Sequence, residues 1–233
     1  MLPLNDDNPT DSTPVVTVTF IVACSLVFLY QSSLLPGPGE TFVYQYGAIP
    51  AVVFGHAALP PEIMAIPAFS TVLTSMFLHG SWMHLIGNML YLWVFGNNIE
   101  DVMGHVKFIV FYLACGIVAA FSHALTDPTS TVPMVGASGA ISGVLGAYLL
   151  LFPHARILLL APVVGTTYVP AGIVLGFWFV MQILSGGASL GSQGGGVAFF
   201  AHIGGFVAGM VLIGFFKRPE VRFFTPARTS SWR

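Results

Sequence analysis

The stretch PMVGASGAISGVLGAYLLLFP, which runs from Pro133 to Pro153, joins a polar start to a long apolar run. The apolar part suits the core of a lipid bilayer, yet Ser138 stands at its beginning, between Gly136 and Gly139. Glycines and alanines recur every few residues after it, and small residues at such spacing let membrane helices approach each other closely. The stretch therefore predicts a closely packed membrane helix, over about 138–152, that begins with a hydroxyl group.

The composition of the whole chain also places it in a membrane. Of its 233 residues, 55% are hydrophobic and only 7% are charged, whereas soluble domains carry about 25% charged residues. So few charged groups cannot cover the surface of a soluble domain, and the length suits one compact bundle. The formal net charge of −2 supplies no basic surface, so we expect no nucleic-acid partner.

Neither a metal site nor a disulfide framework is expected. The two cysteines, Cys24 and Cys115, lie in separate apolar runs, and no Cys/His cluster accompanies them. The first 14 residues contain acids but no Lys or Arg, which is unlike the start of a secretory signal peptide. We therefore expect the first apolar run to be kept as a membrane helix.

The remaining apolar runs predict an all-α membrane protein with six spanning helices. We expect them at about 15–35, 82–99, 106–125, 138–152, 169–184 and 198–216. A long first loop, 39–80, is broken by prolines and is expected to be partly embedded, with short helices; the sequence PGPG before it should close the first helix. A short N-terminal tail (1–14) and a basic C-terminal tail (217–233) flank this domain of residues 15–216, and a glycine-rich stretch, 185–196, predicts a flexible link.

The distribution of charge predicts which way the helices run. Six spans put both termini on one side, and all seven basic residues would fall there: Lys107, Arg156 and five residues after the last helix. The positive-inside rule makes that side cytoplasmic. The second, fourth and sixth helices then begin on the opposite side, where each carries polar groups near its start. Polar side chains at such positions usually face the interior of a bundle or a water-filled cavity.

Two of these polar residues, Ser138 and His202, could form a nucleophile and its base. Ser138 lies in GASG, which lacks the last glycine of the G-x-S-x-G elbow, and a serine at a helix start could equally be an N-cap. His202 lies in AHIGG and could simply bond a backbone carbonyl. However, glycines four residues apart follow both side chains and permit the close approach that a Ser–His hydrogen bond needs. These glycines are Gly139 and Gly143, and Gly205 and Gly209.

The second helix contributes His84 and Asn88, in the sequence HLIGN. The two residues are four apart, so they share one face of the helix. No H-E-x-x-H pattern occurs and no third ligand is evident, which disfavours a metal site. As neutral donors they could stabilise a developing negative charge; a polar contact between helices is the alternative.

The motifs HLIGN, GASG and AHIGG, in this order and spacing, resemble those of the rhomboid family of intramembrane serine proteases. The resemblance covers about 15–216 and implies a six-helix rhomboid bundle with a long first loop. It implies that Ser138 is the nucleophile and His202 the general base, in a dyad without an acidic third member and without a cofactor.

The resemblance also implies the rest of the site. His84, Asn88 and the backbone N–H of Ser138 would form an oxyanion hole, and Gly136 and Gly139 would permit the chain path around the serine. Many relatives carry an aromatic residue four positions after the nucleophile, packed against the histidine. The corresponding residue here is serine, at position 142, which leaves the orientation of the histidine open. The arginine often found in the first loop is also missing.

The implied partners are the lipid bilayer and single-span transmembrane proteins, cleaved in or near the span, commonly after a small residue. The expected location is a prokaryotic plasma membrane, with the site opening to the extracytoplasmic side. Two alternatives remain: a catalytically silent rhomboid-like protein that binds membrane clients, and a small-solute transporter. The transporter is disfavoured because the polar groups gather near one end of the bundle and do not continue inward.

Overall fold

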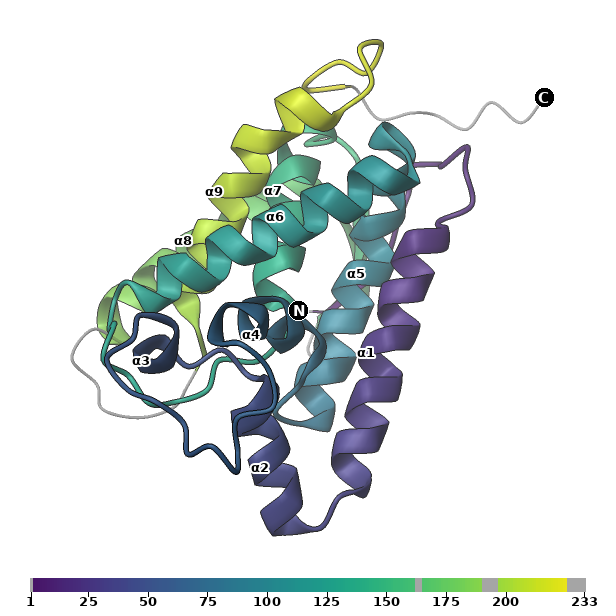
Figure 1. The fold of residues 1–233 in the computed structure, drawn as a ribbon. Helices are drawn as coiled ribbons and strands as arrows, with labels where there is room; N and C mark the ends of the chain where they lie inside the picture. Colours follow the sequence, from purple (N-terminus) through teal and green to yellow (C-terminus); the bar gives the residue numbers. More distant parts are fainter. Residues whose placement is uncertain (1, 162–164, 190–196, 226–233) are drawn as a thin grey trace.

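The structure is a computed structural model that describes residues 2–161, 165–189 and 197–225. Its long helices are α1 (Val15–Ser33), α5 (Trp82–Met103), α6 (His105–Ala124), α7 (Ser138–Leu151), α8 (Ala171–Ser189) and α9 (Phe199–Phe216). A long helix therefore lies at each of the six predicted ranges. Successive long helices alternate in direction, so that α5, α7 and α9 begin at the same end of the bundle (Figure 1).

Within the described residues, four helices are long and apolar enough to cross a membrane: α1, α6, α8 and α9. Helix α7 is apolar but has only 14 residues, and α5 ends in a polar segment that includes Asn98 and Glu100. The protein is thus a mostly helical membrane protein. The count of six spans remains a prediction.

Short helices fill much of the segment between α1 and α5, as expected. They are α2 (Pro36–Tyr46), α3 (Pro50–Val53), α4 (Ala68–Thr74) and the 3-10 turn η1 (Ser75–Phe77). Helix α1 ends at Ser33, just before the PGPG sequence, as predicted, but Pro36 also begins a new helix, α2. Proline suits the first turn of a helix, where its missing N–H group would have no partner.

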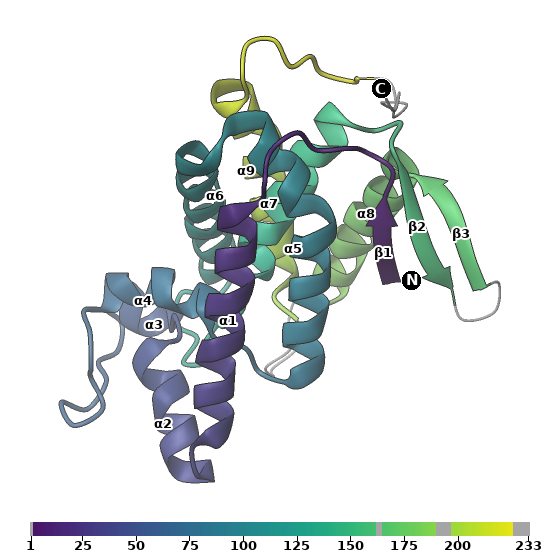
Figure 2. The same cartoon turned by 90° about the vertical axis from the view of Figure 1, so that its right-hand side faces the viewer.

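A small antiparallel sheet departs from the all-α prediction. Its strands, β1 (Leu2–Asp6), β2 (Arg156–Ala161) and β3 (Gly165–Pro170), pair in the order β1-β2-β3. Leu2 pairs with Leu160, so the start of the chain is held by a segment that follows α7. Figure 2 shows the sheet at one side of the bundle, and β1 contacts α5 while β2 and β3 contact α8.

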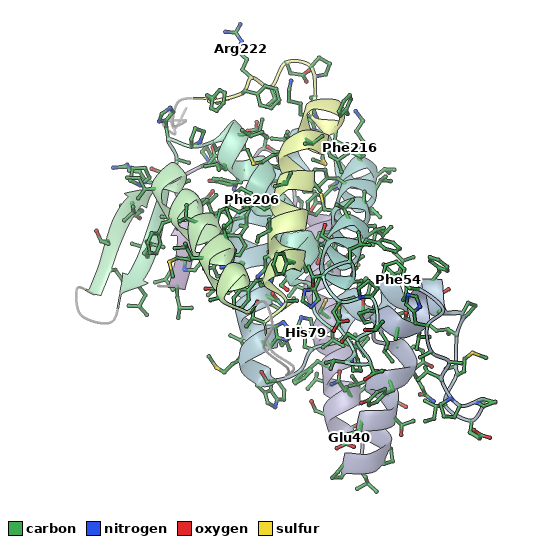
Figure 3. The ribbon with its side chains drawn as sticks, turned by 90° about the vertical axis from the view of Figure 1, so that its left-hand side faces the viewer. Glu40, Phe54, His79, Phe206, Phe216 and Arg222 are labelled. Carbon is green, nitrogen blue, oxygen red and sulfur yellow. The ribbon has the colours of Figure 1, made fainter. Side chains whose placement is uncertain are left out.

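The end of α8 also differs from expectation. Helix α8 runs to Ser189, so the predicted flexible link is wrong for residues 185–189. The rest of that stretch, 190–196, lies outside the described residues, as do residues 226–233 of the basic tail. Five of the seven basic residues are described, and they lie at the end of the bundle where α5, α7 and α9 finish. Arg222 and Phe216, labelled in Figure 3, mark that end, and His79 lies near the opposite one.

Helix α7 is the centre of the bundle. Eleven of its fourteen residues are buried, and it contacts α5, α6, α8 and α9. Its closest partner is α9, where a Cβ atom added to Gly209 would lie 1.9 Å from the carbonyl oxygen of Gly143. A Cβ atom on Gly205 would lie 2.0 Å from the carbonyl oxygen of Gly139. The predicted close approach of the two glycine rows is therefore confirmed.

A buried carboxylate joins two helices at the end of the bundle where α5 finishes. Glu100, at the end of α5, is fully buried and accepts hydrogen bonds from the backbone N–H groups of Val16 and Thr17 at 2.8 Å. These are first-turn donors of α1, which have no partner within their own helix. A negative charge at a helix N-terminus is also favoured by the helix dipole. Glu100 thus joins α5 to the start of α1.

Candidate active site

Ser138 and His202 meet where α7 and α9 begin. The Oγ atom of Ser138 lies 2.9 Å from Nε2 of His202, within hydrogen-bond distance. The glycine contacts between α7 and α9 permit this, because bulkier side chains would hold the two backbones apart. Both side chains are partly accessible, so the pair could receive a reacting group.

The simpler roles considered for these residues, an N-cap for Ser138 and a bond to a backbone carbonyl for His202, do not describe them. Ala137, not Ser138, is the N-cap of α7, and no side chain caps that helix. The hydroxyl of Ser138 instead faces His202. Within the described residues, the ring of His202 bonds no backbone carbonyl; its Nδ1 atom lies 2.8 Å from Oε1 of Gln182, on α8. The three side chains form a chain of hydrogen bonds across α7, α9 and α8.

Gly136 shapes the approach to the serine. Its backbone angle φ is +127°, a value that residues other than glycine rarely adopt. A Cβ atom there would also lie 2.8 Å from Nε2 of His84. Gly139 is the second residue of α7 and packs closely on Ala119 of α6, which agrees with its predicted packing role; its part in the chain path around Ser138 stays a prediction.

His84 and Asn88 both face this turn from α5. Nδ1 of His84 accepts a hydrogen bond from the backbone N–H of Gly80 at 3.3 Å. In a neutral imidazole the other nitrogen, Nε2, then carries the proton and can donate. That donor faces Gly136, next to the start of α7.

Asn88 supplies a second donor. The residue is buried, and among the residues that the structure describes nothing bonds its Nδ2 atom. That atom would lie 3.7 Å from a Cβ atom on Gly136. The first N–H groups of α7, which have no partner within the helix, add further donors. Several neutral donors thus lie near the hydroxyl of Ser138, which is hydrogen-bonded to His202. This arrangement is able to stabilise an oxyanion.

A small cavity of about 40 Å³ adjoins Ser138. Much of its lining comes from residues with little or no side chain, including Gly116, Ala119, Ala198 and Ala201. Met76 also lines it. The cavity can therefore hold a small group beside the hydroxyl.

Sequence reasoning missed two residues, Trp178 and Gln182, both on α8. The ring of Trp178 lies 5.8 Å from that of His202, at an interplanar angle of 36°. A signal was available, since an amide inside an otherwise apolar membrane helix is a candidate functional residue. The sequence alone did not show which face of α8 turns inward.

Comparison with known proteins agrees with these observations. The family model described as Rhomboid domain matches residues 67–219. Rhomboid protein 1, mitochondrial, of Saccharomyces cerevisiae is 32% identical over 146 residues, which make up 60% of this chain and 40% of the relative. Presenilin-associated rhomboid-like protein A, mitochondrial, of Danio rerio is 31% identical over 170 residues, or 67% of this chain and 42% of the relative.

A bacterial relative is similar to the same degree. Rhomboid protease GluP of Bacillus subtilis is 36% identical over 151 residues, or 64% of this chain and 28% of the relative. The matched region spans less than half the length of each of these three relatives. The family model, in contrast, covers well over half of this chain, and the protein belongs to the rhomboid family.

Proposed function

We propose that this protein is an intramembrane serine endopeptidase that cleaves single-span transmembrane proteins in or near the span. The observation that carries the proposal is the 2.9 Å contact between Ser138 Oγ and His202 Nε2, beside the neutral donors of His84 and Asn88. Family membership and the name of the bacterial relative, a rhomboid protease, agree with it.

The chemistry follows from the positions of these groups. Ser138 Oγ attacks the scissile carbonyl carbon while Nε2 of His202 takes the hydroxyl proton. The negative charge moves to the carbonyl oxygen, where Nε2–H of His84, the Asn88 amide and the Ser138 backbone N–H donate hydrogen bonds. Preorganised donors of this kind are worth about 3 kcal/mol each in hydrolases.

The second half of the reaction regenerates the enzyme. The tetrahedral intermediate collapses, the amide C–N bond breaks, and His202 gives its proton to the leaving amine. A water molecule then loses a proton to His202 and attacks the acyl carbon. The bond from that carbon to Ser138 Oγ breaks, His202 returns the proton to Oγ, and the acid product leaves. Water must therefore reach the site, which fits the partial accessibility of both residues.

The substrate must expose a peptide bond that a helix would otherwise hide. Backbone groups of a transmembrane helix are all internally hydrogen-bonded, so substrates with Gly or Pro near the cut should be favoured. The cavity of about 40 Å³ beside Ser138 suits a small side chain at the cleaved bond.

The arrangement in the membrane is part of the same proposal. Six spans, with α5 and α7 added to the four candidate helices, place the basic end in the cytoplasm and the site toward the extracytoplasmic side. The location in a prokaryotic plasma membrane stays a prediction. One relative is bacterial, but the names of the yeast and zebrafish relatives are mitochondrial and do not support it.

A cleavage assay in liposomes tests the proposed function. The substrate is a model single-span protein with Gly and Pro near an Ala at the intended cut, compared with the same protein carrying Phe there. We expect cleavage after Ala, much slower cleavage of the Phe version, and none by Ser138→Ala or His202→Ala.

The alternatives are separate outcomes of that assay. A well-folded wild-type protein that binds the model substrate without cutting it would indicate a catalytically silent client-binding protein. Solute flux through liposomes without cleavage would indicate a transporter. Cleavage that persists in Ser138→Ala would remove the serine from the mechanism.

A further inference from the structure

The orientation of His202 needs a physical cause. An imidazole ring can turn about its side-chain bonds, and it acts as a base for Ser138 only if Nε2 is unprotonated and faces the hydroxyl. The residue one turn after the serine does not hold it, because the hydroxyl of Ser142 bonds back to the carbonyl of Ser138 at 2.7 Å. The contacts that hold the ring come from α8.

Helix α8 turns one narrow face toward the protein. Its buried residues are Ala171, Leu175 and Gly186, and Trp178 and Gln182 continue the same helical stripe. Residues between them, such as Phe177 and Ile183, are exposed. Gln182 is therefore an amide placed on the inward face of a helix whose other faces are apolar.

The amide of Gln182 is aligned at both of its ends. Its Nε2 atom donates to the backbone carbonyl of Trp178 at 3.4 Å, and a carbonyl can only accept. This leaves Oε1 to face Nδ1 of His202, 2.8 Å away. An oxygen acceptor there requires a proton on Nδ1, so Nε2 of the neutral ring is the free acceptor that Ser138 needs.

Among the residues that the structure describes, Gln182 is the one acceptor bonded to Nδ1. Within the described part of the chain, the hydrogen-bond partners of the His202 ring are Ser138 and Gln182. The titratable side chains that would repel a charge on the ring, when they are themselves protonated, are His84 of α5 and His123 of α6. The aromatic contact is also supplied by α8, since Trp178 packs against His202 and against Phe206, which is labelled in Figure 3.

We propose that Gln182 is the positioning residue of the catalytic histidine: it fixes the Nδ1–H tautomer of His202 and turns Nε2 toward Ser138. This inference rests on the proposed function for its kinetic consequence. Gln182 takes the place of an acidic third member without contributing a charge, so it orients the base but does not stabilise an imidazolium ion as a carboxylate would. Trp178 supports the same ring from its side.

Two substitutions separate positioning from packing. Gln182→Met keeps the length and shape of the side chain but offers only a weak sulfur acceptor, so kcat should fall by up to about tenfold, the upper end for the loss of one neutral hydrogen bond, with KM and the unfolding midpoint little changed. Gln182→Glu keeps the acceptor and adds a charge that favours the protonated ring. Its kcat/KM should stay near that of the wild type at high pH, with the acidic limb of the pH profile moved to higher pH.

A control and a second readout keep the two proposals distinguishable. Gln45→Met, on α2 and away from the site, should change neither kcat nor the pH profile. The 15N spectrum of histidine-labelled protein, with His202 assigned by its loss in His202→Ala, reports the tautomer without any turnover. Wild type should show the Nδ1–H form of His202, and Gln182→Met should lose that preference.

The outcomes are then separate. A wild-type protein without proteolytic activity, but with the Nδ1–H tautomer lost in Gln182→Met, would contradict the proposed function and leave the positioning role standing. An active wild type with the same kcat and tautomer in Gln182→Met would overturn the positioning role alone. If Gln182→Met does not fold, an unshifted pH profile in Gln182→Glu would overturn it.

Discussion

The Asn88 side chain shows what individual residues contribute to this site. Its amide nitrogen is buried, and no partner bonds it in the residues that the structure covers. A buried donor without a partner costs about 1–3 kcal/mol, so stability alone does not account for it. Donors of this kind are useful where negative charge appears only in the transition state.

We predict that Asn88→Ala lowers kcat for cleavage of the model substrate by about 100-fold, the loss of one oxyanion donor. KM should change little, because the carbonyl oxygen gains its charge only in the transition state. The matched control, Asn97→Ala, alters the other end of α5 and should retain the wild-type kcat. An effect on KM alone would assign Asn88 to substrate binding instead.

The residues of the site were partly readable from the sequence. Ser138, His202, His84 and Asn88 were found because each lies in a short motif near the start of an apolar run. The structure brings His202 to Ser138, and it brings His84 and Asn88 to Gly136, two residues before the serine. Gln182 was missed because its meaning depends on which face of α8 turns inward, which is a property of packing.

At the scale of elements, the contact between α7 and α9 decides whether the dyad can form. Membrane helices gain little from burying apolar surface against each other, so close van der Waals packing drives their association. Here the backbones touch through glycines, and Gly209 leaves no room for a methyl group beside the carbonyl of Gly143. Pushing α9 away would also carry His202 away from Ser138.

We predict that Gly209→Ala destabilises the protein by about 1–3 kcal/mol, the usual range for overpacking, and also lowers the rate of cleavage. Gly176→Ala on α8 is the matched control, because nothing lies within 4 Å of the added methyl group; it should leave both quantities unchanged. Unfolding in detergent and the cleavage assay measure the two effects. Equal stability of the two variants would contradict the close packing.

The helices and the strands differ in how well the local sequence predicts them. Long apolar helices were readable because their length and hydropathy are local properties. The strands β2 and β3 were not, since a short apolar run looks the same in a strand and in a buried helix. The pairing of β1 with β2 joins segments more than 150 residues apart, and no local pattern encodes it.

At the scale of the whole molecule, the N-terminal segment ties the sheet to the helical bundle. Asp6, at the end of β1, accepts hydrogen bonds from the hydroxyl of Tyr148 on α7 and from Asn98 on α5. Burial raises the pKa of Asp6 from 3.8 to about 6, with Asp7 acting in the same direction. The folded protein therefore keeps a proton on Asp6 at pH values where the unfolded chain has lost it.

This linkage predicts that the contribution of Asp6 to stability is greatest below about pH 4 and declines as pH rises to about 6. Asp6→Asn should match the wild type near pH 3.5 and be more stable at pH 7 by up to about 3 kcal/mol, since each pKa unit corresponds to about 1.4 kcal/mol. Unfolding in detergent at a series of pH values measures the difference.

Asp6→Asn must be compared with the wild type at each pH because other groups titrate over the same pH range. Burial lowers the pKa of His79 to about 4, which makes stability rise with pH between about 4 and 6.5 and opposes the effect of Asp6. Asp127→Asn, in an exposed loop, serves as the control and should follow the wild type. An Asp6→Asn curve parallel to the wild type would contradict the raised pKa.

The central claim is that His202 activates Ser138 for nucleophilic attack. The most direct measurement is the rate at which a fluorophosphonate probe labels the purified protein, with the modified residue identified by mass spectrometry. We predict a single adduct on Ser138 and a rate at least about 100-fold lower in His202→Ala, because a general base contributes about 100-fold or more. Folded wild-type protein that forms no adduct, or a His202→Ala variant that is labelled as fast as the wild type, would contradict it.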